Sequence, residues 1–148
     1  MAFADKISVA INGYGVIGKR VADAVACQDD MTVAGVCDVA TDWRRRVALR
    51  RGHALFGASA AQVDAMARAG LKPAGSLDDL LGRADVVVDC TPKRVAAKNI
   101  ETYRQRGLKF IVQGGEKHEV TGHSFVAEAN YDTALGRESL RRSMPYVR

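Results

Sequence analysis

ISVAINGYGVIG, residues 7–18, is the segment that decides the fold of this 148-residue chain. Its first half, Ile7 to Asn12, is a short apolar run of the kind that forms a buried strand. From Val16 to Gln28, apolar residues recur at every fourth position beginning with Ile17, which is the spacing of a buried helix face. The segment therefore predicts a strand, a tight glycine-rich turn and a helix in direct succession.

The glycines of that turn, Gly13, Gly15 and Gly18, have the spacing G-x-G-x-x-G. In this pattern the first glycine allows a tight turn, the second leaves room for a pyrophosphate, and the third lets the helix pack close to the sheet. The N–H groups at the helix N-terminus attract an anion. The pattern predicts a dinucleotide-binding site, with a purely structural glycine turn as the alternative.

The same residues also begin a second phosphate-binding pattern, G-x-x-x-x-G-K, which is completed by Lys19. A P-loop needs a serine or threonine at the next position, because that hydroxyl binds magnesium. Arg20 stands there instead. The sequence therefore disfavours a nucleoside triphosphatase.

An acidic residue occupies the position at which dinucleotide-binding sites hydrogen-bond the ribose of the cofactor. Asp38 ends the apolar run 33–38, 20 residues after Gly18, and a carboxylate at that place accepts a hydrogen bond from the ribose 2′-hydroxyl. Asp38 therefore favours NAD. Arg44 to Arg46 follow closely, and a guanidinium group matches the geometry of a 2′-phosphate, so NADP stays possible. A solvated helix face is the other interpretation of these arginines.

The rest of the chain repeats the alternation of strands and helices. Further strands are expected at 33–38, 85–89 and 108–113, with a short extended piece at 53–57. Further helices are expected at 42–51, 59–70, 77–83 and 93–106. Such alternation forms right-handed βαβ units. The prediction is a single-domain α/β fold, a Rossmann-type doubly wound and mostly parallel sheet with helices on both faces.

Two loops follow strands at the edge where an open α/β sheet binds its ligands. In the first loop, Thr91 and Pro92 are expected to border the adenosine or the pyrophosphate. In the second, the glycines at 114–115 would allow a close approach to the nicotinamide side. An ordinary turn after a strand is the alternative for both.

Composition limits the remaining classes. The chain is 47% hydrophobic and 26% charged, and no apolar run approaches the roughly 18 residues of a membrane span. Three widely spaced cysteines favour a cytoplasmic protein over a disulfide framework. The net charge of +5 comes largely from residues 137–148, which hold four arginines and one glutamate, so a nucleic-acid surface is disfavoured.

Other kinds of catalytic site find little support. The three histidines lack metal-ligand spacing, and there is no G-x-S-x-G pattern of a serine hydrolase. Cys90 follows a strand near the expected cleft, where a small buried core residue is the simpler interpretation. No metal site and no catalytic residue are expected.

Five motifs, INGYGVIGKRVADAV, QDDMTVAGV, ADVVVDCTPK, QGGEK and SFVAEANYDTALG, resemble the archaeal-type (type II) glyceraldehyde-3-phosphate dehydrogenases. The resemblance runs from Ser8 to Arg141. It implies the N-terminal NAD(P)-binding domain of a phosphorylating oxidoreductase of glycolysis. It also implies that Val16 and Ile17 contact the cofactor through their backbones and that Gly115 borders the nicotinamide.

The chain departs from that family at two places. The family usually has lysine or threonine where Asp38 stands, which puts its dual use of NAD and NADP in question here. After Arg141 the family continues with S-C-N-T-T, which supplies the catalytic cysteine, whereas Pro145 stands near that place in this chain. We therefore expect a Rossmann domain over 1–141, a basic tail over 142–148 that is off the family pattern, and no catalytic domain. The Arg-rich end from Glu138 to Arg148 is expected to be loosely packed or disordered.

Two kinds of protein fit these expectations. The first is a truncated or frameshifted dehydrogenase chain that binds the dinucleotide and cannot catalyse alone; a catalytic domain or a second copy would be its partner. The alternative is a free-standing NAD(P)-binding module with a sensing or partner-binding role. Neither membrane nor nucleic acid is expected as a partner.

Overall fold

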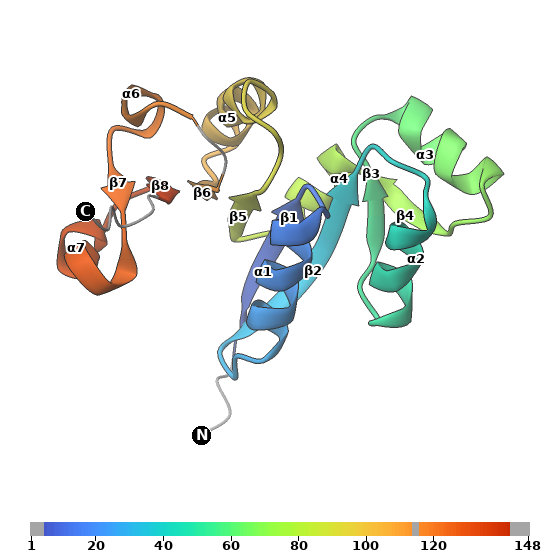
Figure 1. The fold of residues 1–148 in the computed structure, drawn as a ribbon, viewed down its shortest axis with the longest axis horizontal. Coiled ribbons are helices and arrows are strands. Elements are labelled where there is room, and N and C mark those ends of the chain that lie inside the picture. The colour runs from blue at the N-terminus through green and yellow to red at the C-terminus, as the bar shows by residue number, and fades with distance from the viewer. Residues whose placement is uncertain (1–4, 114–115, 143–148) are drawn as a thin grey trace.

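The computed structural model describes residues 5–113 and 116–142, which form an α/β fold around one parallel sheet (Figure 1). The elements in chain order are β1 (Ile7–Asn12), α1 (Val16–Ala26), β2 (Met31–Asp38), α2 (Trp43–Arg50), β3 (Leu55–Gly57), α3 (Ala60–Arg68), β4 (Pro73–Ser76), α4 (Leu77–Leu81), β5 (Val86–Asp89), α5 (Val95–Gln105), β6 (Lys109–Val112), α6 (His118–Thr121), β7 (Ser124–Phe125), α7 (Ala127–Ala134) and β8 (Ser139–Arg142). The predicted fold class is confirmed.

The sheet has eight strands in the order β4-β3-β2-β1-β5-β6-β8-β7, and every neighbouring pair is parallel. Strands β2, β3 and β4 follow one another outward on one side of β1. Strand β5, the next along the chain, lies on the other side of β1. The strand order therefore reverses between β1 and β5. In an open α/β sheet this reversal leaves a crevice outside the carboxyl ends of the two strands, where ligands bind.

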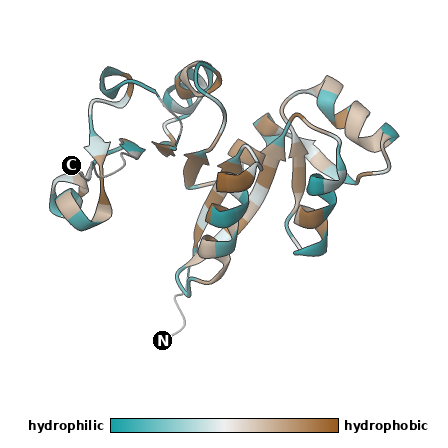
Figure 2. Ribbon diagram, viewed as in Figure 1, coloured by the Kyte–Doolittle hydropathy of each residue, from teal (hydrophilic) through white to brown (hydrophobic). Residues whose placement is uncertain are grey.

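Helices cover both faces of the sheet. The buried residues of β1, which point alternately to opposite sides, therefore pack in two separate apolar clusters. Val9 and Ile11 pack in one apolar cluster with residues of α1, α2 and α3. Ala10 packs in a second cluster with residues of α4 and α5. Burial on both faces explains why the central strands are continuously apolar. Figure 2 shows this hydrophobic character in β1, β5 and β6, whereas β7 and β8 are pale or hydrophilic.

The strands and helices predicted between residues 7 and 113 lie within two residues of the observed bounds. Strand β4 was not predicted, because its Pro73 and Gly75 are unusual in strands. A proline lacks the N–H that a central strand must donate, but an edge strand tolerates it, and β4 forms one edge of the sheet.

The prediction of loose packing for the Arg-rich end is wrong for residues 139–142. They form β8, which pairs with β6 on one side and β7 on the other. The Arg141 guanidinium donates to the Glu116 carbonyl at 2.9 Å and to Ser124 Oγ at 3.3 Å. Backbone pairing and these polar contacts stabilise β8. Because the strand does not depend on apolar burial, its sequence has no apolar pattern from which it could be predicted. The remaining tail, 143–148, lies outside the described residues.

None of the helices in 5–113 and 116–142 combines the length and the apolar composition needed to cross a membrane.

Arg94 holds a left-handed backbone conformation with φ of 73°, alone among the non-glycine residues that the structure describes. This conformation costs a residue with a Cβ about 1–2 kcal/mol. Replacing Arg94 with glycine is therefore expected to raise the free energy of unfolding by about 1 kcal/mol in urea denaturation. Lys98→Gly is the control, because Lys98 is exposed within α5 and a glycine there should lower stability by a similar amount. Equal destabilisation by both substitutions would contradict the prediction.

Candidate functional site

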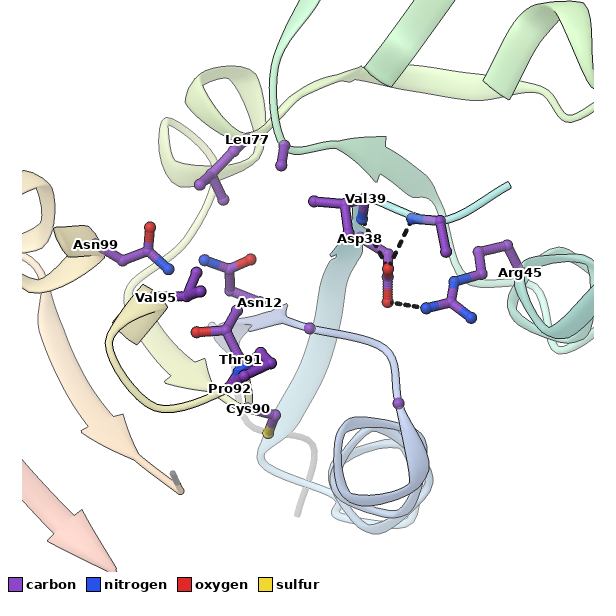
Figure 3. A pocket seen from close by; sticks show the side chains of 14 residues that line it. Asn12, Asp38, Val39, Arg45, Leu77, Cys90, Thr91, Pro92, Val95 and Asn99 are labelled. Carbon is purple, nitrogen blue, oxygen red and sulfur yellow. Dashed lines mark hydrogen bonds and ion pairs between the residues drawn. The ribbon is translucent and has the colours of Figure 1, made fainter. Parts of the chain in front are cut away.

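A pocket of about 420 Å³ opens at the carboxyl ends of β1 and β5, where the strand order reverses (Figure 3). This volume lies within the usual range of small-molecule sites. The lining residues come from the ends of β1 and β2, from the loops that follow β1, β2, β3 and β5, and from α2, α4 and α5. They are Asn12, Gly13, Gly15, Asp38, Val39, Ala40, Arg45, Ala58, Leu77, Cys90, Thr91, Pro92, Val95 and Asn99.

The three glycines of the first loop meet three different steric demands. Gly13 has φ of +95°, and a Cβ there would lie 2.8 Å from the carbonyl carbon of Cys90. A Cβ on Gly18 would overlap the carbonyl oxygen of Gly13. A Cβ on Gly15 would meet no protein atom within 4 Å, because that position faces the pocket. Gly13 and Gly18 are therefore required by the fold, whereas Gly15 leaves open space for a ligand.

Helix α1 begins at the edge of this space. Gly15 is its N-cap and has no side chain to cap the first turn. The side chains of Val16 and Ile17 are 67% and 45% exposed, so only the backbone of this turn is suited to hold an anion. This arrangement fits the pyrophosphate of a dinucleotide.

Asp38 lies at the end of β2 on the pocket wall and is buried. Its Oδ1 accepts hydrogen bonds from the backbone N–H groups of Val39 at 2.7 Å and Ala40 at 3.0 Å. Its Oδ2 accepts one from the Tyr14 N–H at 2.8 Å and forms an ion pair with Arg45 Nη2 at 2.6 Å. Asp38 therefore joins the glycine-rich loop to the β2–α2 loop and to α2.

Arg45 reaches from α2 to Asp38, across the pocket from Asn99 and Val95 (Figure 3). Its side chain is 9% exposed, and its Nη1 also contacts Asp42 Oδ1 at 3.0 Å. The Nε atom of Arg45 is buried without a hydrogen-bond partner in the described part of the chain. Of the three arginines that follow Asp38, the fold thus brings only the middle one into the pocket lining.

A buried polar network supports the loop after β5. The Asp89 carboxylate, which is fully buried, accepts hydrogen bonds from Asn99 at 3.0 Å and from the Tyr103 hydroxyl at 2.7 Å. Thr91 donates to the same carboxylate through its N–H at 2.9 Å and its hydroxyl at 2.5 Å. The network fixes Thr91 and Pro92 at the pocket and engages both the N–H and the hydroxyl of Thr91.

The predicted site residues are thus partly brought together. Gly13, Gly15, Asp38, Thr91 and Pro92 line one pocket. Val16 and Ile17 lie at the adjoining start of α1, and Gly18 packs that helix against the loop. Gly115 lies outside the described residues.

Sequence reasoning missed the apolar walls of the pocket, Val39, Ala58, Leu77 and Val95, together with the amides of Asn12 and Asn99. A positional signal exists for several of them. Val39, Ala58 and Leu77 each follow a parallel strand directly, and residues in that place meet at the ligand-binding edge of the sheet. Asn12 carries a similar signal, because it is the last residue of β1, whereas Asn99 lies within α5 and carries none.

Two cysteines, Cys37 and Cys90, lie at or near the site. Cys37 is fully buried, and burial, reinforced by the charges of Asp38 and Asp89, raises the pKa of its thiol to about 12. Cys90 is half-buried and lines the pocket. Among the described residues, no three His, Cys, Asp or Glu side chains form a group that could hold a metal ion.

Comparison with known proteins gives both a family and close relatives. A family profile described as dihydrodipicolinate reductase, N-terminus, matches residues 7–120. The chain is 52% identical over 135 residues to glyceraldehyde-3-phosphate dehydrogenase of Methanothermobacter thermautotrophicus, and 48% identical over 134 residues to that of Methanothermus fervidus. These matches cover 91% and 90% of this chain and fall on the N-terminal regions of the relatives, which confirms the resemblance found in the sequence.

The chain spans about 40% of the length of these two relatives. Among solved structures, GenD2 from gentamicin A biosynthesis in complex with NAD superposes with a TM-score of 0.56 at 18% identity. That match covers 74% of this chain and 27% of GenD2. At this identity the likeness supports the fold alone.

Proposed function

The chain belongs to the family of the dihydrodipicolinate reductase N-terminus, and on that premise we propose that its pocket binds NAD(P) as the cofactor domain of a phosphorylating glyceraldehyde-3-phosphate dehydrogenase. The match over residues 7–120 includes every residue that lines the pocket. The choice of dehydrogenase rests on the identity of about 50% to the archaeal enzymes over nine-tenths of this chain.

The observation that carries the proposal is the open space at Gly15 beside the uncapped first turn of α1. Space without a Cβ and N–H groups without side-chain partners suit a pyrophosphate. The apolar wall formed by Ala58, Leu77 and Val95 suits an adenine ring on the other side of the pocket. The described residues therefore fit the two recognisable parts of an adenine dinucleotide.

In this proposal the chain binds and orients the cofactor. The bound nicotinamide would supply the hydride acceptor for aldehyde oxidation. Asp38 fixes the glycine-rich loop through the Tyr14 N–H, and Asp89 fixes the Thr91–Pro92 loop. The attacking thiol and the binding of the aldehyde and phosphate substrates would come from a catalytic domain of the kind that the longer relatives contain. A cytoplasmic location and such a domain partner remain predictions.

Calorimetric titration of the chain tests cofactor binding. NAD or NADP should bind at one saturable site, and ADP should compete, because it carries the adenosine and pyrophosphate that the pocket fits. ATP with magnesium is the control, because the P-loop alternative predicts tight, magnesium-dependent binding. Absence of dinucleotide binding at millimolar concentration would refute the proposal.

A chimera tests the choice of dehydrogenase. Residues 1–142 would be joined to the part of the Methanothermobacter thermautotrophicus relative that this chain does not match. We expect the purified chimera to reduce NAD(P) in the presence of glyceraldehyde 3-phosphate and inorganic phosphate. A folded chimera that binds dinucleotide without this activity would argue against the assignment while leaving cofactor binding intact.

A further inference from the structure

A buried carboxylate fixes the amide groups of two asparagines that line the pocket. The carboxylate of Asp89 has about four acceptor positions. Four donors occupy them, namely the N–H and the hydroxyl of Thr91, Asn99 Nδ2 at 3.0 Å and the Tyr103 hydroxyl at 2.7 Å. Because the Tyr103 hydroxyl donates its one hydrogen to Asp89, it accepts from Asn12 Nδ2, which lies 2.7 Å away. The direction of both amides therefore follows from the carboxylate.

The amide of Asn99 cannot turn over without a loss. A reversed amide would place Oδ1 of Asn99 against the carboxylate of Asp89, so that two acceptors would face each other. The fully buried Asp89 would lose one of its donors at the same time. The bond to Asp89 uses one hydrogen of Nδ2. Oδ1 and the other hydrogen of the same amide remain for a partner in the pocket.

Asn99 belongs to the apolar wall of the pocket. Val95 and Asn99 lie one helical turn apart on α5, and both line the pocket together with Leu77. Figure 3 shows these three side chains on one side of the pocket, opposite Asp38 and Arg45. The wall on which an aromatic ring would pack thus carries one amide, which is placed to meet the edge of such a ring.

The other polar side chains of the lining are engaged with the protein. Asp38 and Arg45 form an ion pair at 2.6 Å on the opposite wall. The hydroxyl of Thr91 and the amide of Asn12 both donate within the buried network, and Asn12 is only 3% exposed. Asn99 is half-buried and keeps both an acceptor and a donor for a ligand.

An amide of fixed direction distinguishes two kinds of purine. Adenine presents an amino donor next to a ring-nitrogen acceptor, and asparagine matches this pair with its carbonyl and its N–H. Hypoxanthine and guanine carry a carbonyl in place of the 6-amino group, so they would set an acceptor against Oδ1 of Asn99. Because Asp89 holds Nδ2, the amide cannot turn over to accept them. The lock on the amide therefore favours adenine.

We propose that Asn99, with its amide held by Asp89, is the residue by which the pocket selects a 6-aminopurine. The inference rests on the proposed binding of an adenine dinucleotide and deepens it by naming the group that recognises the base. An apolar wall alone discriminates poorly between rings of the same shape, whereas a hydrogen-bonding group rejects a mismatched ring strongly. The site therefore discriminates against inosine and guanosine nucleotides.

The test compares the dissociation constants of NAD and of nicotinamide hypoxanthine dinucleotide, which differs from NAD only by a carbonyl in place of the 6-amino group. In calorimetric titration, wild type should bind NAD roughly tenfold or more tightly, as for one asparagine–adenine pair. In Asn99→Ala, NAD should weaken by roughly the same factor and the hypoxanthine dinucleotide should not, so the ratio falls to about one. ADP and IDP should give the same ratios, because the difference lies in the base.

Lys98→Ala is the matched control, because Lys98 is the exposed neighbour of Asn99 on α5 and is not a lining residue of the pocket. It should keep the wild-type ratio. Asn99→Ala removes one donor from Asp89, so thermal unfolding is measured before titration. If that variant does not fold, Asn99→Ser takes its place, because serine supplies a hydroxyl donor without the amide. The wild-type ratio is measured without any variant.

The outcomes separate the two proposals. If neither NAD nor the hypoxanthine dinucleotide binds, the proposed function fails. If both bind and wild type does not prefer NAD, the role of Asn99 is refuted and dinucleotide binding stands. If wild type prefers NAD and the folded Asn99 variant keeps the same ratio, another group recognises the base and the role of Asn99 is equally refuted.

Discussion

Gly18→Ala is expected to lower the free energy of unfolding by about 3 kcal/mol or more and to abolish dinucleotide binding. The new Cβ would overlap the Gly13 carbonyl oxygen, and its next contacts are the Gly13 carbonyl carbon and Cys90 Cβ, at 2.9 and 3.5 Å. Backbone atoms cannot swing aside as a flexible side chain can. Relief therefore requires α1 to move away from the sheet, which would also displace the first turn that faces the pyrophosphate.

Gly15→Ala is the matched substitution, because it adds the same methyl group in the same loop. No protein atom lies within 4 Å of that position, so stability should change by less than about 0.5 kcal/mol. Binding should still weaken by roughly tenfold or more, because the methyl group would occupy the space of the pyrophosphate. Thermal unfolding and calorimetric titration of both variants separate the two effects. A Gly15→Ala variant that binds normally would place the pyrophosphate elsewhere.

Asp38→Asn is expected to lower the free energy of unfolding by about 3–5 kcal/mol. The substitution leaves the Arg45 guanidinium buried beside a neutral amide, and the amide NH₂ would face groups that are themselves donors. Asp38 and the Arg45 side chain are only 7% and 9% exposed, so water cannot replace the lost charge. The loop that carries Tyr14 loses its anchor at the same time.

Asp42→Asn is the control, because Asp42 contacts the same guanidinium from a position that is 43% exposed. An exposed ion pair is worth little, and asparagine caps a helix as well as aspartate does, so the cost should stay below about 1 kcal/mol. Urea denaturation of both variants gives the comparison. If both substitutions lowered the free energy of unfolding equally, burial would not strengthen the Asp38–Arg45 ion pair.

These two pairs of variants address different parts of the same site. The glycine pair distinguishes what the fold requires from what the ligand requires, although only two residues separate the two positions. The aspartate pair tests whether Asp38 acts mainly as a support. If Asp38→Asn is as stable as wild type, the original expectation that Asp38 reads the ribose becomes the better interpretation.

The sequence by itself determined the fold class and the position of the ligand site. Apolar runs and helical spacing place the elements from Ile7 to Gln113 because burial on both sheet faces leaves a strong local pattern. The glycine spacing determines the turn that bears the phosphate site. Each glycine is there because of the space around its own Cα, and this space is defined by one loop and the neighbouring strand. Thr91 and Pro92 were found from their place after a strand.

Only the tertiary structure decided which charged and polar groups act together. Nothing local distinguishes Arg45 from Arg44 and Arg46, yet the packing of α2 against the sheet buries one of the three and gives it Asp38 as a partner. Strand β8 likewise forms through pairing with β6 and contacts of Arg141, although its sequence is polar. Ion pairs and backbone pairing depend on what the fold brings within about 3 Å, and sequence spacing does not encode that distance.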